Sequence, residues 1–302
     1  MNVITLRLVL RRLSCLSKGM PSCVALAAAI VPFLFYGVAA NEAPASSWSD
    51  GYRSRVRLIA GKLAPAGTGP ASAVLAGIEM EFPVAWKTFW RNPGDAGVPP
   101  SFDWSKSVNI AEATVLYPAP KAFVDPSGVI IGYQDRVVFP VVVTARDPAL
   151  PATLRVTVEY GVCKDICIPA QADIALDIAP GLNSPVPAVL AAAFDEVPRQ
   201  RGQERAGDPV VTSATSQLKG SNPHLVVDAL VPGGASAALA FLVMSDGGFM
   251  PLPVREPGPD ADRARFVVDL SKDVDIRDLT GKTVLVTITG PKGSSEAEIK
   301  IE

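Results

Sequence analysis

Cys163 and Cys167 are the residues of this chain whose type and spacing could do chemistry. The sequence of 302 residues contains four cysteines, and the other two, Cys15 and Cys23, lie in a basic and apolar N-terminal segment. If that segment is a leader, one close pair of cysteines remains in the mature protein. In an exported protein such a pair forms a local disulfide, a redox site or part of a metal site.

The N-terminal segment has the features of a secretory leader. Residues 1–40 contain basic but no acidic side chains, and the apolar run Val24–Ala40 ends in a small-x-small pattern that suits a signal peptidase. We therefore predict a signal peptide over residues 1–40, cleaved after Ala40, and a mature protein that begins at Asn41. In a bacterium this protein would be periplasmic. An uncleaved inner-membrane anchor that leaves the rest facing the periplasm is the alternative.

The short spacing of the two cysteines favours redox use over an inert crosslink. Three residues between them can form a hairpin connection, and the flanking residues then face each other across the ladder near the Cβ separation of a disulfide. A short cross-strand bridge is expected to be strained, and strained, exposed disulfides are reduced most easily. As a structural crosslink the bridge would contribute little, because closing so short a loop changes the chain entropy little.

Metal binding is the third interpretation of the pair. Two thiolates do not complete a tetrahedral zinc site, and the sole histidine, His224, follows Pro223 far along the chain, where a surface position is expected. Two thiolates can hold the soft ion Cu(I), so copper stays open. We predict no cofactor and no metal site, with a Cu(I)-binding copper-tolerance factor as one form of the alternative function.

Composition argues against several other classes. The net charge is −2, and removal of the basic leader makes the mature part more acidic still, which disfavours nucleic-acid binding. One histidine leaves no base for a Ser-His pair, and no glycine-rich phosphate loop occurs. The 24 glycines and 28 prolines argue against a mainly helical protein. A hydrophobic content of 48% is sufficient for sizeable cores, and the length favours two domains.

Strand patterns flank the cysteine pair. Leu154–Tyr160 alternates apolar with polar residues, and Ile168–Ile178 does the same, so we predict an antiparallel hairpin with the cysteines at its tip. Further strands are predicted over Arg55–Ala60, Ala73–Phe82 and Val137–Thr144. Because Gly/Pro turns rather than amphipathic helices separate these strands, they indicate a β-sandwich over residues 48–180.

The rest of the chain predicts a second domain. A short helix over Ala188–Glu196 and a charged, apolar-poor stretch over residues 199–208 indicate a helix and linker at residues 181–206. Strand patterns then resume over Leu225–Val231, Ala237–Met244, Arg265–Leu270, Thr283–Thr289 and Glu296–Ile301. We predict a second, smaller β-sandwich over residues 207–302, which makes the fold class all-β.

Three segments resemble the N-terminal periplasmic domain of the DsbD thiol:disulfide interchange proteins, especially the ScsB-like branch. They are Trp86–Trp104 (WKTFWRNPGDAGVPPSFDW), Ile131–Val141 and Tyr160–Pro169. The resemblance covers roughly residues 50–180 and implies an immunoglobulin-like sandwich. It also implies a domain that receives electrons from a thioredoxin-like or membrane electron-relay partner and passes them to oxidised periplasmic proteins. We interpret the aromatic residues of the first segment as core packing.

The resemblance implies roles for individual residues. Cys163 and Cys167 become the catalytic pair, with Cys167 attacked by the partner thiolate and Cys163 as the resolving thiol. Family members shield the cysteines with a loop that bears an aromatic residue. Pro126 lies near that position here, which leaves Phe123 as the cap candidate. Next to the pair, Lys164 would favour a thiolate and Asp165 would oppose it.

The sequence departs from the family in two ways. Three residues separate the cysteines, whereas the best-known members have a wider gap. The membrane domain and the C-terminal thioredoxin-like domain of the family are not found in the sequence, so we expect one component of a disulfide reductase system. The alternative is a non-enzymatic periplasmic binding or interaction protein, with copper or a partner protein as ligand.

Overall fold

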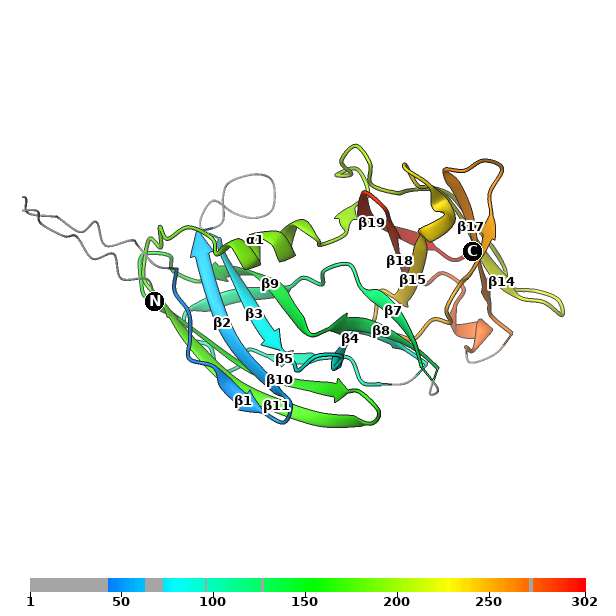
Figure 1. The fold of residues 1–302 in the computed structure, drawn as a ribbon. Coiled ribbons are helices and arrows are strands. Elements are labelled where there is room, and N and C mark those ends of the chain that lie inside the picture. Colours follow the sequence, from blue (N-terminus) through cyan, green and yellow to red (C-terminus); the bar gives the residue numbers. More distant parts are fainter. Residues whose placement is uncertain (1–42, 63–72, 96, 126–127, 272–273) are drawn as a thin grey trace, which may run out of the picture. The chain divides into compact units, whose positions relative to one another are not determined.

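The computed structural model describes residues 43–62, 73–95, 97–125, 128–271 and 274–302. Of the two units into which the chain divides, the second, residues 41–302, contains all the described residues, and the predicted signal peptide over residues 1–40 lies outside them. Strands dominate the second unit, as Figure 1 shows, so the predicted all-β class is confirmed. The described residues contain no helix that is long and apolar enough to cross a membrane.

The first sandwich consists of two sheets. One has five strands in the order β1-β2-β3-β9-β6, and the other has the order β11-β10-β4-β8-β7, with β5 paired to β10. The strands of the first sheet are β1 (Ser49–Gly51), β2 (Ser54–Lys62), β3 (Val74–Glu81), β9 (Arg136–Ala145) and β6 (Ile110–Val115). Those of the second sheet are β11 (Cys167–Ile178), β10 (Ala152–Cys163), β4 (Lys87–Gly94), β8 (Gly128–Gln134), β7 (Lys121–Asp125) and β5 (Ser101–Asp103).

The predicted cysteine hairpin is formed by β10 and β11. Their antiparallel ladder runs without interruption from Ala152↔Ile178 to Cys163↔Cys167. Along β10 the side chains predicted to face inward are buried and belong to the core of the first sandwich, whereas Arg155 and Glu159 are exposed. The period-2 pattern therefore places Cys163 on the outer face of the sheet, because it is an odd number of residues from the inward-facing Val162.

Helix α1 (Ala188–Asp195) covers part of the five-stranded sheet. Leu190 and Ala193 on this helix are buried in a small cluster with Ile59, Leu75 and Val138. The predicted helix is thus confirmed, and it packs on the first sandwich.

The second sandwich also has two sheets, ordered β12-β19-β18-β15 and β13-β14-β17-β16. Its strands are β12 (Arg199–Gln200), β13 (Val210–Gln217), β14 (His224–Leu230), β15 (Leu239–Met244), β16 (Val254–Pro257), β17 (Arg263–Asp269), β18 (Thr283–Gly290) and β19 (Gly293–Lys300). Two short 3₁₀ turns lie at Ala235–Ala237 and Ile276–Asp278. The stretch predicted as linker differs in one detail: Arg199 and Gln200 form β12, which pairs in parallel with β19.

Strand β4 connects the two sandwiches. Its pairing with β8 shifts register between Phe89 and Gly94, and the intervening residues bind the second sandwich instead. The Asn92 amide donates to the carbonyls of Leu242 at 2.6 Å and Met250 at 3.2 Å. The sequence Asn-Pro-Gly-Asp is typical of an exposed turn, but Asn92 is only 2% exposed and belongs to β4, which ends at Gly94.

Two further neighbours of Asn92 strengthen this connection. The Trp90 and Phe241 rings lie 5.7 Å apart, and Arg91 forms an ion pair with Glu296. Burial lowers the pKa of the Arg91 guanidinium. A partly buried cation is stabilised by a partner: the Glu296 carboxylate pairs with the Arg91 guanidinium, and the Thr287 hydroxyl oxygen accepts from it at 3.1 Å.

Candidate functional site

A disulfide joins Cys163 to Cys167 at the tip of the β10–β11 hairpin. The two Cα atoms are 4.1 Å apart, and the cysteines are directly opposite each other in the ladder. The predicted cross-strand placement is therefore confirmed. The two residues differ in access, since Cys163 is 1% exposed and Cys167 is exposed. A thiolate from another protein can thus approach Cys167 far more easily than Cys163.

An apolar cluster buries Cys163 on the outer face of the sheet. It consists of Cys163, Phe89 and Ile130, with Phe123 packed against it. Two glycines make room for the Phe89 ring: a Cβ on Gly161 would lie 2.6 Å from a ring atom, and a Cβ on Gly97 would lie 2.2 Å from one. Phe89 was predicted to be core packing. The burial of Phe89 confirms this prediction. Its place in the cluster shows that Phe89 also covers Cys163, the less accessible cysteine.

The structure places the cap candidate Phe123 beside Cys163. Phe123 lies on β7, is partly buried, and contacts the cluster that contains this cysteine. The Lys87 ammonium lies 5.6 Å from the centroid of the Phe123 ring, within the range of a cation–π contact. Pro126 lies outside the described residues.

Asp95 in the GDAGVPP segment binds the start of the second strand of the β7–β8 hairpin. The backbone N–H of Asp95 donates to the Val129 carbonyl at 2.9 Å, and the Asp95 carboxylate accepts from the Val129 N–H at 2.7 Å. Asp95 thus ties the start of β8 to the end of β4. Because Gly97 lies in the same segment against Phe89, this part of the GDAGVPP sequence covers the apolar cluster.

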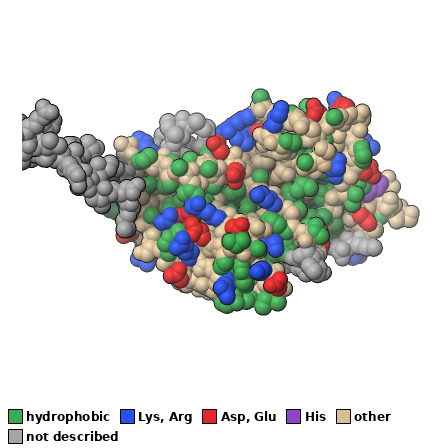
Figure 2. Space-filling view, in the orientation of Figure 1, with side chains coloured by type: hydrophobic (Ala, Val, Ile, Leu, Met, Phe, Trp, Pro, Cys, Tyr) green, Lys and Arg blue, Asp and Glu red, His purple; other side chains and the backbone are tan. Residues whose placement is uncertain are grey.

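The three residues between the cysteines point to solvent. Lys164, Asp165 and Ile166 are exposed, with Ile166 at 67%, and the Lys164 N–H donates to the Ile166 carbonyl at 3.2 Å. In the space-filling view, the end of the first sandwich that carries this hairpin tip shows hydrophobic side chains beside basic and acidic ones (Figure 2). The tip therefore presents an exposed cysteine within a mixed surface.

Residues 55–178 match the family model described as "Thiol:disulfide interchange protein DsbD, N-terminal". The match contains the β10–β11 hairpin, the three members of the cluster around Cys163 and Phe123, which packs against it. These residues form a DsbD N-terminal-like domain. The resemblance predicted from the three sequence segments is confirmed.

A solved structure extends the likeness in fold to more of the chain. It is the N-terminal periplasmic domain of ScsB from Proteus mirabilis, with a TM-score of 0.63 and 24% sequence identity. The alignment covers 86% of this chain and 99% of that one, so it reaches beyond the DsbD N-terminal-like domain into the second sandwich. No curated protein matches the chain.

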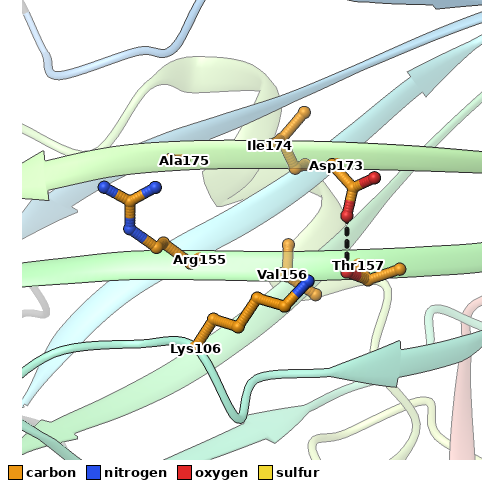
Figure 3. Close-up of a pocket in the computed structure, with 7 residues that line it drawn as sticks. All are labelled: Lys106, Arg155, Val156, Thr157, Asp173, Ile174 and Ala175. Atoms are coloured by element: carbon orange, nitrogen blue, oxygen red, sulfur yellow. Dashed lines mark hydrogen bonds between the residues drawn. The ribbon is translucent and has the colours of Figure 1, made fainter.

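A shallow pocket on the DsbD N-terminal-like domain is distinct from the cysteine site. Lys106, Arg155, Thr157 and Asp173 contribute side chains to it, on the outer face of β10 and β11 (Figure 3). Hydrogen bonds from Thr157 and Gln171 lower the pKa of Asp173. Thr157 is six residues before Cys163, or about 20 Å along the strand, so this pocket does not adjoin the disulfide.

The described residues contain no group of three or more His, Cys, Asp or Glu side chains that could hold a metal ion. His224 begins β14 on the second sandwich, and its Nδ1 lies 2.8 Å from the Asn222 carbonyl oxygen. The structure therefore does not bring the histidine to the cysteine pair.

Sequence reasoning did not identify Lys87 and Asp95 as residues of the site. Lys87 is the β4 residue that pairs with Cys163, although 76 positions separate them in the sequence. Only the register of β4 against β10 brings them together. Asp95 stood in a segment that suggested a turn, and its contact with β8 is equally non-local.

Proposed function

We propose that this protein is a periplasmic thiol–disulfide exchange module whose Cys163–Cys167 disulfide accepts electrons from a thioredoxin-like or membrane electron-relay partner. It then passes them to oxidised exported proteins. The observation that carries the proposal is the unequal access of the two cysteines, one exposed at a hairpin tip and one buried under Phe89. Such an arrangement directs an incoming thiolate to one sulfur of the bridge.

The reduction proceeds in two exchange steps. A partner thiolate attacks Sγ of Cys167, a bond forms between the two proteins, the Cys163–Cys167 bond breaks, and Cys163 leaves as a thiolate. The partner's second thiolate then attacks the partner sulfur of this mixed disulfide, and Cys167 leaves. The partner ends as a disulfide and this chain as a dithiol. Two electrons have moved, and the two protons lost by the partner thiols are returned through solvent.

The delivery step reverses these roles. The Cys167 thiolate attacks a disulfide of an oxidised exported protein, and Cys163 then resolves the mixed disulfide, which releases the reduced substrate and restores the bridge. Phe123, packed at the cluster around Cys163, acts as the cap that limits access by unrelated thiols and oxidants.

Trapping experiments test the assignment of the two cysteines. Cys163→Ser leaves Cys167 without a resolving thiol. If Cys167 of this variant is first converted to its mixed disulfide with thionitrobenzoate, the thiolate of a thioredoxin that lacks its own resolving cysteine should attack Cys167, displace thionitrobenzoate and stay bound as a mixed disulfide. Cys167→Ser should capture far less, because Cys163 is buried. Non-reducing electrophoresis with mass analysis identifies the crosslink. Equal capture by both variants would contradict the assignment.

A double variant tests whether the bridge is structural. The loop that the bridge closes is short, so Cys163→Ser/Cys167→Ser should stay folded and lose all exchange activity. Cu(I) titration of the reduced chain distinguishes the exchange module from the alternative, a Cu(I)-binding protein. Tight stoichiometric binding of Cu(I), together with no reduction of the disulfide by a thioredoxin, would overturn the proposed function.

A further inference from the structure

Lys87 is aligned with the cysteine pair across three strands. It pairs with Cys163 in the β4–β10 ladder, and Cys163 pairs with Cys167 in the β10–β11 ladder. Residues directly opposite each other in antiparallel strands project to the same face, with Cβ atoms about 4.5–5.5 Å apart. The side chains of Lys87, Cys163 and Cys167 therefore form one row on the outer face of the sheet.

The middle position of this row is where a negative charge is hardest to accommodate. When Cys167 is attacked, the departing sulfur belongs to Cys163, which is 1% exposed and packed against Phe89 and Ile130. Burial in apolar surroundings raises the pKa of a thiol, and a thiol of higher pKa leaves more slowly. A cation near Cys163 would offset this cost.

Contacts of the Lys87 side chain keep its ammonium at the site. Lys87 is half-buried, and its Nζ lies 5.6 Å from the centroid of the Phe123 ring, which itself packs against the Cys163 cluster. A cation held over an aromatic face keeps its charge while its aliphatic part covers apolar surface. The ammonium thus lies at the ring that packs against the cluster of Cys163, and the Lys87 backbone is paired with that of Cys163.

Other charged groups around the row are less well placed. Lys164 and Asp165 lie in the exposed hairpin loop, and their charges oppose each other. Lys121 on β7 and Glu159 on β10 are exposed, and the Asp135 carboxylate accepts from the Ala85 N–H at 2.6 Å.

The other cation of β4 is already used: Arg91 forms its ion pair with Glu296. Among the residues that the structure describes, Lys87 is therefore the cation that strand pairing places directly opposite Cys163.

We propose that Lys87 is a positioning residue of the exchange reaction, which stabilises the thiolate of Cys163 as the Cys163–Cys167 bond breaks. This inference rests on the proposed function for its biological meaning, but the bond-breaking step is a property of the disulfide itself. The cleavage transfers an electron pair to the Cys163 sulfur, and the Lys87 ammonium compensates the new charge without giving up its proton.

The main test compares Lys87→Met with Lys87→Arg in the full chain. Reduction by dithiothreitol is followed under pseudo-first-order conditions, because this probe needs no docking surface. For attacking thiols a Brønsted coefficient of about 0.5 gives roughly a threefold change in rate per pKa unit, and we expect a dependence of similar size, with opposite sign, for the leaving thiol Cys163. Lys87→Met should therefore be reduced roughly three- to tenfold more slowly, and Lys87→Arg, which keeps the charge, should restore most of the rate.

Two control variants separate this effect from net charge and from the hairpin loop. Lys106→Met removes one positive charge at the remote pocket and should leave the rate unchanged. Lys164→Met removes the exposed cation next to Cys163 in sequence and should slow reduction less than Lys87→Met. Equal rates for Lys87→Met and the unmodified chain, or a larger effect at Lys164, would overturn the inference.

A direct measurement of the thiol completes the test. In reduced Cys167→Ser that also carries Cys15→Ser and Cys23→Ser, Cys163 is the single thiol, and the pH dependence of its alkylation by iodoacetamide gives its pKa. Adding Lys87→Met should raise this pKa, a change that mere loosening of the fold would not produce, because greater exposure to water lowers the pKa of a buried thiol. An unchanged or lowered pKa would contradict the proposed role.

Failure of the inference and failure of the proposed function give different results. If a thioredoxin reduces the unmodified chain and Lys87→Met behaves identically, only the role of Lys87 is wrong. If dithiothreitol shows the Lys87 effect but no thioredoxin reduces the chain, the chemistry of the bridge stands and the exchange module is wrong.

Discussion

At the scale of single residues, the site depends on how closely side chains cover one sulfur. Phe89 covers Cys163 only because neither Gly161 nor Gly97 carries a Cβ that would meet its ring. Gly161 is two residues before Cys163 on the same face of β10, so it sets how near the ring can approach the buried cysteine. The unequal access of the two cysteines therefore depends on a residue that has no side chain.

Gly161→Ala tests this dependence. The new Cβ would lie 2.6 Å from the Phe89 ring, which must shift, and overpacking of this kind costs about 1–3 kcal/mol. We expect a lower free energy of unfolding in urea and, in the reduced protein, faster alkylation of Cys163. Gly181→Ala is the control, since a Cβ there meets nothing within 4 Å, although its φ of +64° adds some backbone strain. Unchanged alkylation in Gly161→Ala would show that Phe89 does not limit access.

At the scale of elements, side-chain ties between neighbouring strands stabilise the second sandwich. Asp228 on β14 accepts from Arg265 Nε on β17 at 2.8 Å and from the Ser213 hydroxyl on β13 at 2.9 Å. These contacts, the Arg265 hydrogen bond foremost, lower the pKa of Asp228. One carboxylate thus links three adjacent strands.

Asp228→Asn should weaken this sheet in a pH-dependent way. Because the pKa of Asp228 is lower in the folded than in the unfolded protein, its stabilisation is complete above the unfolded value of about 3.9 and is lost as pH falls through the folded value. At neutral pH the free energy of unfolding of the variant should be lower by less than about 1 kcal/mol, since the Asp228–Arg265 pair is solvent-accessible. At pH 2 it should differ little from that of the unmodified chain. Urea unfolding at several pH values measures this. Ser213→Ala keeps the Arg265 bond and should retain most of the pH dependence.

Prediction from sequence succeeded where an element carries its own pattern. Strand β10 alternates between buried and more exposed residues from Ala152 to Tyr160, and β11 does so from Ala172 to Ile178. Helix α1 is bounded by prolines, so the burial of these stretches can be predicted locally. Strand β4 could not be predicted in this way. Its residues 90–93 leave β8 and bind the second sandwich, so their burial depends on contacts more than 140 residues away.

The cysteine pair and the cap candidate could be found from the sequence, but the surrounding charge could not. Lys164 is adjacent to Cys163 in sequence and exposed, whereas Lys87 is distant in sequence and directly opposite it in the ladder. Strand register decides between them, and register follows from the pairing of whole sheets rather than from any short segment.

At the scale of the whole molecule, residues 41–302 form one compact unit although they contain two sandwiches. Arg91 and Asn92 of the first sandwich bind Glu296, Leu242 and Met250 of the second. The covalent connection through residues 199–208 is therefore supplemented by polar contacts of buried groups, which are costly to separate because each would lose its partner.

A nicked chain tests this connection. Arg201 and Arg205 are exposed, so brief trypsin treatment should cut there. We expect the two fragments to elute together in size-exclusion chromatography and to separate only in denaturant. Arg91→Met/Asn92→Ala should allow separation under native conditions. Immediate separation of the fragments of the unmodified chain would show that the β4 contacts do not hold the sandwiches together.

The position of the disulfide at the very end of a long ladder affects how readily the bond can form again after it has been reduced. Eleven residue pairs, from Ala152↔Ile178 to Val162↔Ile168, keep the two strands in register whether or not the sulfurs are joined. Opening the bridge therefore frees only the hairpin tip, and the released thiols stay at a high effective concentration. Under the proposed function, each exchange cycle can therefore end with the same Cys163–Cys167 bond re-formed, without refolding of the hairpin. The hairpin thus holds the two cysteines in the position in which their disulfide can form again after each reduction.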